Sequence, residues 1–244
     1  MDRKKLNKAT RRILLIASVL IFLVVCWEVY VHHDYDAENV EEYLLGEDGL
    51  LVSEIEEGWF FDGPGEEALI FYPGAKVDPT AYAPLMSAFA QDGIDCYLVK
   101  MHDNLAFFGV NKAADIMEKY NAEKWYLSGH SLGGAMAAKF AREHADSLEG
   151  LILFGAYTTS DLSNTDLSVY TIYGSNDLVV NREKLMAQTS LLPKVHGELE
   201  IQGGNHAGFA FYGPQKGDGE AEISKEEQIG TAVSYVMYAL GKVE

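Results

Sequence analysis

The sequence Ser128-Gly-His-Ser-Leu-Gly-Gly134 constrains the fold more than any other part of the chain, because of what lies on either side of it. An apolar run, residues 124–127, precedes it and a helix-like run, residues 132–144, follows it. A G-x-S-x-G pattern in the order strand, sharp turn and helix is typical of a nucleophile elbow, in which only glycine fits beside the serine. The pattern predicts an exposed Ser131 hydroxyl at a helix N-terminus, where backbone N–H groups stabilise a developing oxyanion.

Strand-like and helix-like runs alternate from about residue 46 onward. Strands are expected at residues 50–55, 59–61, 68–72, 96–101, 125–127, 150–154, 169–173 and 198–201, and helices at residues 79–91, 111–120, 132–144, 181–191 and 224–240. The middle strands are apolar throughout, as expected for strands covered on both faces. The alternation predicts an α/β fold with a mainly parallel, doubly wound sheet of about six to eight strands. In such a sheet the site forms at the carboxyl ends of the strands.

A serine nucleophile needs a base, and His206 is the best placed of the seven histidines. It follows the last expected strand in a glycine-flanked loop, at the edge of the sheet where Ser131 is also expected. His130 directly precedes the serine, so its side chain is expected to point away across the turn. His102 lies at the right edge but comes before the elbow. The sequence therefore selects His206.

The acid is expected between the nucleophile and the base, at the end of a strand. Residues 169–173 lead into a Gly-Ser-Asn turn that ends at Asp177, where a carboxylate can orient the imidazole. Asp161 and Asp166 are rivals, but both lie in a polar loop before that strand. The order serine, aspartate, histidine is the chain order of α/β-hydrolases and differs from that of other serine-hydrolase folds.

An oxyanion hole needs two N–H donors. Leu132, the residue after the nucleophile, supplies one of them. The other is expected from the loop after the strand at residues 68–72, which reads Pro-Gly-Ala-Lys. Because Gly74 lets the backbone approach closely, the Ala75 N–H is the first choice and the Lys76 N–H is the second.

Residues 69–85 read Leu-Ile-Phe-Tyr-Pro-Gly-Ala-Lys-Val-Asp-Pro-Thr-Ala-Tyr-Ala-Pro-Leu, and Val99-Lys-Met101 and Asn104-Leu-Ala106 follow. These segments resemble the bacterial alpha/beta hydrolase fold-5 family, and the resemblance covers residues 68–210. It implies an α/β-hydrolase fold with a triad at the three positions selected above, and relatives among esterases and dienelactone-hydrolase-like enzymes. Tyr-Pro-Gly stands where α/β-hydrolases more commonly carry His-Gly, which is a departure at the second oxyanion donor.

The predicted reaction is hydrolysis of a carboxylic ester through an acyl-enzyme, which requires no metal and no cofactor. Only residues 155–168 separate two strands at the place where related enzymes insert a lid, so the expected site is open and takes a small or medium ester. Six aromatic residues are candidates for an acyl pocket: Tyr72, Phe107, Phe108, Tyr157, Phe209 and Phe211. A catalytically silent binding module and an acyltransferase are the alternatives.

The N-terminal segment is apolar and follows a basic block. Residues 13–27 carry no charge, and continuation to Val31 gives about 19 residues, the length that spans a bilayer. The small residues that normally precede a signal-peptide cleavage site are missing after the apolar run. A lipoprotein signal would need a small residue before Cys26, and Val25 fits this poorly. An uncleaved signal anchor fits best, with its N-terminus in the cytoplasm.

The expected organisation is therefore a basic cytoplasmic segment at residues 1–12, a transmembrane signal anchor at 13–31, a linker at 32–45 and a hydrolase domain at 46–244. The domain would lie on the extracytoplasmic side of a cell membrane. The 244-residue chain has a formal net charge of −18, which argues against nucleic acid as a partner. Its two cysteines, Cys26 and Cys96, lie in separate apolar runs, so neither a disulfide nor a metal site is expected.

Overall fold

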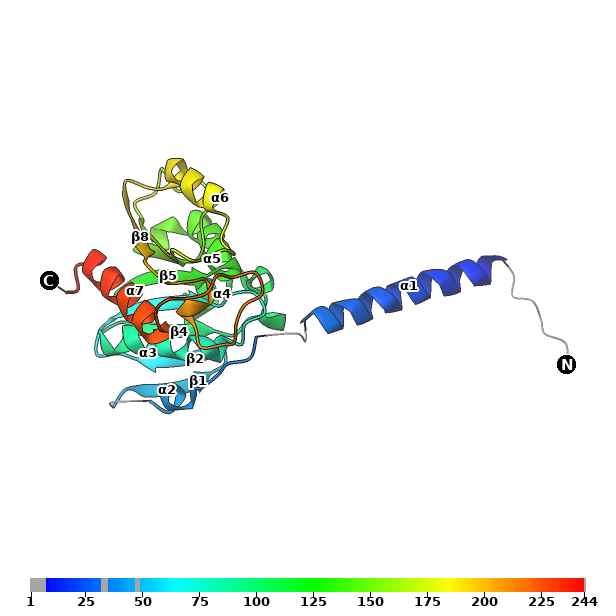
Figure 1. Ribbon diagram of the computed structural model, residues 1–244, viewed down its shortest axis with the longest axis horizontal. Coiled ribbons are helices and arrows are strands. Elements are labelled where there is room, and N and C mark those ends of the chain that lie inside the picture. Colours follow the sequence, from blue (N-terminus) through cyan, green and yellow to red (C-terminus); the bar gives the residue numbers. More distant parts are fainter. Residues whose placement is uncertain (1–7, 32–34, 47–48, 244) are drawn as a thin grey trace. The chain divides into compact units, whose positions relative to one another are not determined.

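The computed structural model describes residues 8–31, 35–46 and 49–243 (Figure 1). The chain divides into two compact units, Met1–Asp34 and Tyr35–Glu244. The described part of the first unit is one helix, α1 (Lys8–Val31). Its window Thr10–Trp27 is long and apolar enough to cross a membrane, a property that signal sequences share. Most of the expected basic segment, residues 1–7, lies outside the described residues.

The second unit is built on one eight-stranded sheet in the order β1-β2-β4-β3-β5-β6-β7-β8. The strands are β1 (Leu51–Ile55), β2 (Gly58–Asp62), β3 (Glu67–Tyr72), β4 (Asp95–Val99), β5 (Lys124–His130), β6 (Gly150–Phe154), β7 (Ser168–Gly174) and β8 (Val195–Ile201). β2 runs antiparallel to both β1 and β4, and every other pair is parallel. The predicted α/β fold with a mainly parallel sheet is confirmed.

The α-helices of this unit are α2 (Glu41–Leu45), α3 (Ala83–Gln91), α4 (Lys112–Lys119), α5 (Leu132–Glu143), α6 (Arg182–Ala187) and α7 (Lys225–Ala239). Short 3₁₀ helices are η1 (Pro79–Tyr82), η2 (His102–Asn104), η3 (Ala106–Gly109), η4 (Ala145–Ser147), η5 (Gln188–Leu191) and η6 (Ala207–Phe209). The helix expected at residues 79–91 therefore starts as η1. A continuous helix would bring the ring of Pro84 against the carbonyl four residues earlier, so the chain restarts as α3.

Alternate residues of the central strands pack on opposite faces of the sheet, which explains why these strands are apolar throughout. In β3, Leu69 and Phe71 join the core under α3 and α7, whereas Ile70 and Tyr72 join the core under α4 and α5. All four of these side chains are buried. The edge strand β1 is mostly exposed, and its sequence carries correspondingly more polar residues.

The segment at residues 35–45 differs from the linker that the sequence predicts. The Tyr35 N–H donates to the Lys76 carbonyl at 2.7 Å, and the Asp78 N–H donates to the Tyr35 carbonyl at 2.9 Å. The Tyr35 ring lies 5.4 Å from the Tyr212 ring, and Val40 is buried in the core. These contacts come from single side chains and main-chain bonds, so they leave no periodic pattern in the sequence. The compact unit begins at Tyr35 rather than at residue 46.

The described chain between β6 and β7 contains no helix, as the length of residues 155–168 predicts. The carboxyl edge of the sheet therefore carries no helical lid at this position. All the candidate site residues come from segments that follow the carboxyl ends of β3, β5, β7 and β8.

Candidate active site

Ser131 occupies the sharp turn between β5 and α5, as the elbow pattern predicts. Its backbone has a positive φ of 53° with ψ of −121°, a region that residues with a Cβ rarely adopt. The turn is held by two main-chain bonds: the Ser131 N–H donates to the Phe154 carbonyl at 3.0 Å, and the Ala135 N–H donates to the Ser131 carbonyl at 3.1 Å. A Cβ at Gly133 would lie 2.1 Å from the Tyr72 carbonyl oxygen, so the elbow packs directly against the end of β3.

The loops after β7 and β8 bring Asp177 and His206 together. The His206 Nδ1 lies 2.8 Å from the Asp177 Oδ2, and both side chains are almost completely buried. The other carboxylate oxygen accepts the N–H groups of Val179 and Val180 at 2.9 and 2.8 Å. A carboxylate so placed accepts the Nδ1 proton and stabilises positive charge on the ring. It also fixes the tautomer, which leaves the His206 Nε2 as the free acceptor.

The His206 Nε2 is buried and has no hydrogen-bond partner among the described residues. Buried polar atoms are normally hydrogen-bonded, so an unpartnered one suggests a reactive role. His206 and Ser131 line the same cavity, which has a volume of about 320 Å³. Its other walls are Leu132, Ala135, Gly155, Ala156, Tyr157, Thr159, Val179, Val180 and Asn181. None of these side chains is charged.

The loop after β3 offers Ala75 rather than Lys76 as an oxyanion donor. The Lys76 N–H already donates to the Asn104 carbonyl at 2.8 Å, and the Gly74 N–H donates to the Tyr82 hydroxyl at 3.0 Å. The N–H groups of Ala75 and Leu132 donate to no group within the described residues. Because the elbow packs on this loop, these two N–H groups are the available pair.

Gly155 contributes to the site, although the sequence reasoning passed over it. It follows β6 with a positive φ of 50°. A Cβ there would lie 2.9 Å from the His206 Nδ1 and 3.3 Å from the Asp177 Oδ2. The signal was a lone glycine directly after the apolar strand, which marks close approach of the backbone to another group.

His130 points away from the serine cavity, as expected, but it contacts the rest of the site. Its Nδ1 lies 2.7 Å from the Tyr82 hydroxyl, and its Nε2 lies 3.1 Å from the His206 carbonyl oxygen. Burial holds the pKa of this ring well below the ordinary value of 6.5, and the nearby His206 ring lowers it further. His130 is therefore neutral. Tyr82 was not selected from the sequence at all.

The expected aromatic pocket is largely wrong. Among the six candidates only Tyr157 lines the serine cavity. Tyr72 and Phe209 are fully buried and Phe211 nearly so, and all three belong to the core, whereas Phe107 and Phe108 are exposed. The Tyr72 hydroxyl shows why: it donates to the Val110 carbonyl at 2.7 Å and accepts the Ala113 N–H at 2.8 Å, on the α4 face of the sheet.

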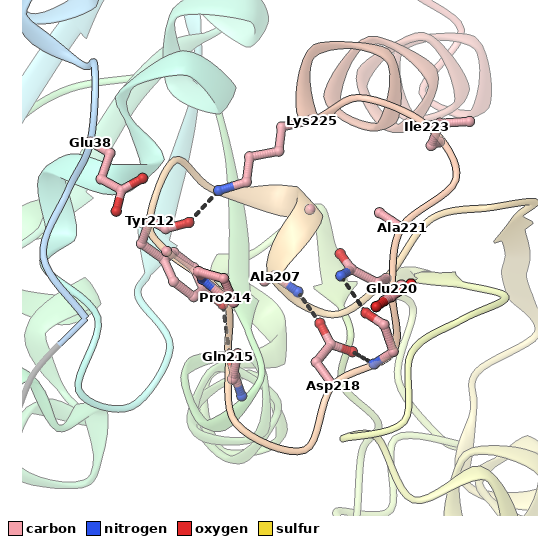
Figure 2. Close-up of a pocket in the computed structure, with 14 residues that line it drawn as sticks. Glu38, Ala207, Tyr212, Pro214, Gln215, Asp218, Glu220, Ala221, Ile223 and Lys225 are labelled. Atoms are coloured by element: carbon pink, nitrogen blue, oxygen red, sulfur yellow. Dashed lines mark hydrogen bonds between the residues drawn. The ribbon is translucent and has the colours of Figure 1, made fainter.

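A larger cavity of about 640 Å³ is lined in part by Asn205 and Ala207, the neighbours of His206 (Figure 2). It shares no lining residue with the serine cavity. Asp218 in its wall accepts the N–H groups of His206 and Ala207 at 3.1 and 2.9 Å. Figure 2 shows the Lys225 amine donating to the Tyr212 carbonyl across the same cavity. The smaller cavity is the candidate site, because Ser131 and His206 both line it.

The strand order, the serine at positive φ between β5 and α5, and the buried Asp177–His206 pair together are those of an α/β-hydrolase fold. The sequence pattern of the alpha/beta hydrolase family matches residues 68–230. The chain belongs to this family, which confirms the family resemblance of residues 69–85.

Solved structures share the fold at low sequence identity. Est1E from Butyrivibrio proteoclasticus is 12% identical with a TM-score of 0.58, over 80% of this chain and all of that one. The carboxylesterase CesB from Bacillus subtilis is 10% identical with a TM-score of 0.55, over 82% of this chain and 94% of that one. Mouse alpha/beta hydrolase domain-containing protein 10 is 12% identical with a TM-score of 0.55, over 80% and 100%. No curated protein matches the sequence.

Proposed function

We propose that the chain is a serine hydrolase that cleaves carboxylic esters, with Ser131 as nucleophile, His206 as general base and Asp177 as the residue that orients the base. One observation carries the proposal: His206, whose buried Nε2 is unpartnered among the described residues, lines the same cavity as Ser131. Membership of the hydrolase family supports it, and so does the similarity of the fold to a carboxylesterase.

The reaction follows from the roles of these atoms. The Ser131 Oγ attacks the ester carbonyl carbon while its proton passes to the His206 Nε2. The bond to the leaving alkoxy group then breaks, and that group takes the proton from Nε2. Water attacks the acyl-enzyme in the same manner and releases the carboxylic acid. The N–H groups of Leu132 and Ala75 hold the oxyanion in both tetrahedral intermediates, and Asp177 stabilises the transient imidazolium.

The cavity favours an uncharged acyl group of small or medium size. Its volume is about 320 Å³ and its wall carries no charged side chain besides His206. Buried charge without a partner is costly, so a carboxylate or ammonium on the acyl chain would bind poorly. The net charge of −18 adds long-range repulsion of anionic substrates.

The test is covalent labelling of the full-length protein in detergent with a fluorophosphonate, followed by hydrolysis of p-nitrophenyl esters from acetate to laurate. We expect the wild type to be labelled and the Ser131→Ala variant to be unlabelled and inactive. Ser128→Ala is the matched control, because Ser128 is a fully buried serine of the preceding strand β5 that does not line the cavity. An unlabelled wild type would favour a silent binding module. Labelling with transfer to an added alcohol instead of water would favour an acyltransferase.

We further propose that α1 is an uncleaved single-pass anchor, with the basic N-terminus in the cytoplasm and the hydrolase domain outside. The apolar window Thr10–Trp27 and the basic residues Arg11 and Arg12 at its start support this orientation. Carbonate extraction of membranes and protease protection of spheroplasts test it. A mature protein that lacks residues 1–31 would contradict the anchor.

A further inference from the structure

We propose that Tyr82 and His130 are positioning residues of this reaction: their hydrogen-bonded pair joins the loop that carries Ala75 to the loop that carries His206. The inference rests on the proposed function, because it assigns these residues a role in the same site. Neither side chain lines the serine cavity, so neither touches substrate.

Three hydrogen bonds form a continuous relay between the two loops. The Gly74 N–H donates to the Tyr82 hydroxyl oxygen at 3.0 Å. That hydroxyl lies 2.7 Å from the His130 Nδ1, and the His130 Nε2 lies 3.1 Å from the His206 carbonyl oxygen. A main-chain N–H can only donate and a carbonyl can only accept. The His130 Nε2 therefore carries the ring proton, and the Tyr82 hydroxyl donates to Nδ1.

The relay keeps one direction because both side chains stay neutral. Tyr82 is fully buried and His130 is 1% exposed. Burial raises the pKa of Tyr82 and lowers the pKa of His130. The titratable side chain that faces His130, besides Tyr82, is His206, whose ring centroid lies 4.5 Å away, and the Phe209 ring covers it at 5.9 Å.

Gly74 shows that the oxyanion loop rests directly on this pair. A Cβ at Gly74 would lie 2.8 Å from the Tyr82 hydroxyl oxygen and 2.9 Å from the His130 Nδ1. A displacement of either ring therefore moves the main chain next to Ala75. The same ring of His130 holds the main chain of His206, so one pair fixes both the oxyanion donor and the base.

The reaction needs those two groups in a fixed relative position. Displacement of a catalytic group by about 1 Å lowers the rate by about 100-fold, and a supporting shell must hold such groups within about 0.5 Å. A loose pair would slow the chemical step while substrate still fills the same cavity. A positioning role therefore predicts an effect on kcat rather than on KM.

Tyr82→Phe tests the pair with the loss of a single oxygen atom, because the phenyl ring keeps its packing against Phe71. We expect kcat to fall by about 10- to 100-fold while KM changes by less than about threefold. Tyr72→Phe is the matched control. Tyr72 is also fully buried, and its hydroxyl likewise accepts one main-chain N–H and donates one hydrogen bond, here to a carbonyl on the other face of the sheet. This control should lose similar thermal stability and keep a kcat near the wild-type value.

His130 variants and a double mutant complete the test. His130→Gln retains an amide that can donate to the His206 carbonyl, so its kcat should lie between those of wild type and His130→Ala. Once Tyr82→Phe has broken the relay, the further loss from His130→Ala should be smaller than in the wild-type background. If His130→Ala does not fold, the comparison of Tyr82→Phe with Tyr72→Phe is sufficient to test the positioning role.

The outcomes separate this inference from the proposed function. A wild type that fluorophosphonate does not label overturns the proposed function and the positioning role with it. A labelled wild type overturns the positioning role alone if Tyr82→Phe keeps its kcat, if KM rises in its place, or if Tyr72→Phe slows the reaction equally.

Discussion

The segments around His130 and His206 each bury a histidine at the carboxyl edge of the sheet, yet the two rings differ in what their nitrogens do. Their centroids are 4.5 Å apart and both residues are 1% exposed. Both nitrogens of His130 have protein partners, whereas His206 has a partner at Nδ1 and none at Nε2 among the described residues. Burial alone therefore does not identify the base. The base that we propose is the ring whose second nitrogen has no partner among the described residues.

The two segments also differ in what holds them. His130 ends β5 and is fixed between a central strand and α5. The loop of His206 is braced by side chains instead: Asp218 accepts the His206 N–H, and Gln228 both accepts from the Asn205 N–H at 3.0 Å and donates to the Asn205 carbonyl at 2.8 Å. These hydrogen bonds hold the main chain on either side of the His206 ring.

Replacement of the histidine in each of the two segments should give the largest difference in kcat. His206→Ala removes the proton acceptor, and kcat should fall by about 10⁶-fold, close to the effect of Ser131→Ala. His130→Gln, at equal burial, should lower kcat by about tenfold. Steady-state kinetics on one p-nitrophenyl ester measures both. Equal losses at the two positions would remove the distinction between base and positioning residue.

Asp177→Asn should have the next largest effect, because an amide cannot fix the tautomer of His206 or stabilise its positive charge. We expect kcat to fall by about 10⁴-fold with little change in KM. Asp161→Asn, at a rival position that the sequence leaves in a polar loop, is the control and should keep full activity. A normal rate for Asp177→Asn would exclude it from the triad.

Asp218→Asn should have a smaller effect, because it weakens a brace and not the chemistry. An amide can accept only part of what the carboxylate accepts, so at least one N–H of the His206 loop loses its partner. We expect kcat to fall by about tenfold and the free energy of unfolding to fall by about 1–3 kcal/mol. Glu220→Gln changes an exposed residue of the same cavity and should change neither quantity. Urea denaturation and kinetics on both variants make the comparison.

The smallest effect concerns the pH dependence of stability. The pKa of His130 is lowered by burial in the folded chain, whereas in the unfolded chain it lies near 6.5. Below that pH the unfolded chain binds a proton that the folded chain does not. The free energy of unfolding therefore decreases as the pH is lowered, by up to about 1.4 kcal/mol per pH unit. His130→Gln should remove this slope in urea denaturation between pH 7 and pH 5. His196→Gln, at an exposed ring, should keep it.

Sequence reasoning found residues that follow apolar strands, because strand ends in a parallel sheet meet at one edge. Ser131, Asp177 and His206 all follow such runs, and the structure brings the last two within 2.8 Å. The roles of the three remain predictions. The sequence predicts this strand at residues 198–201, but β8 starts at Val195, because His196 and Gly197 interrupt its first part with residues that are not typical of strands.

The contacts that the sequence could not predict join residues that are distant along the chain and have no periodic signature. Tyr82 and His130 are 48 positions apart, and nothing in the sequence around either residue predicts a contact with the other. Gly155 is close to the His206 ring and to Asp177, which come from the loops after two other strands. Residues 35–45 pack through a few individual contacts. Such pairings are consequences of the assembled sheet, so they become visible only once it is built.

The positive φ of Ser131 lowers the stability of the folded chain, although the proposed reaction requires a serine at this position. A serine at φ 53° and ψ −121° holds conformational strain of about 1–3 kcal/mol, which glycine would relieve at no steric cost. A chain with glycine at this position would be inert and harder to unfold. Under the proposed function, the strained turn therefore lowers the stability of the chain in order to expose the Ser131 hydroxyl.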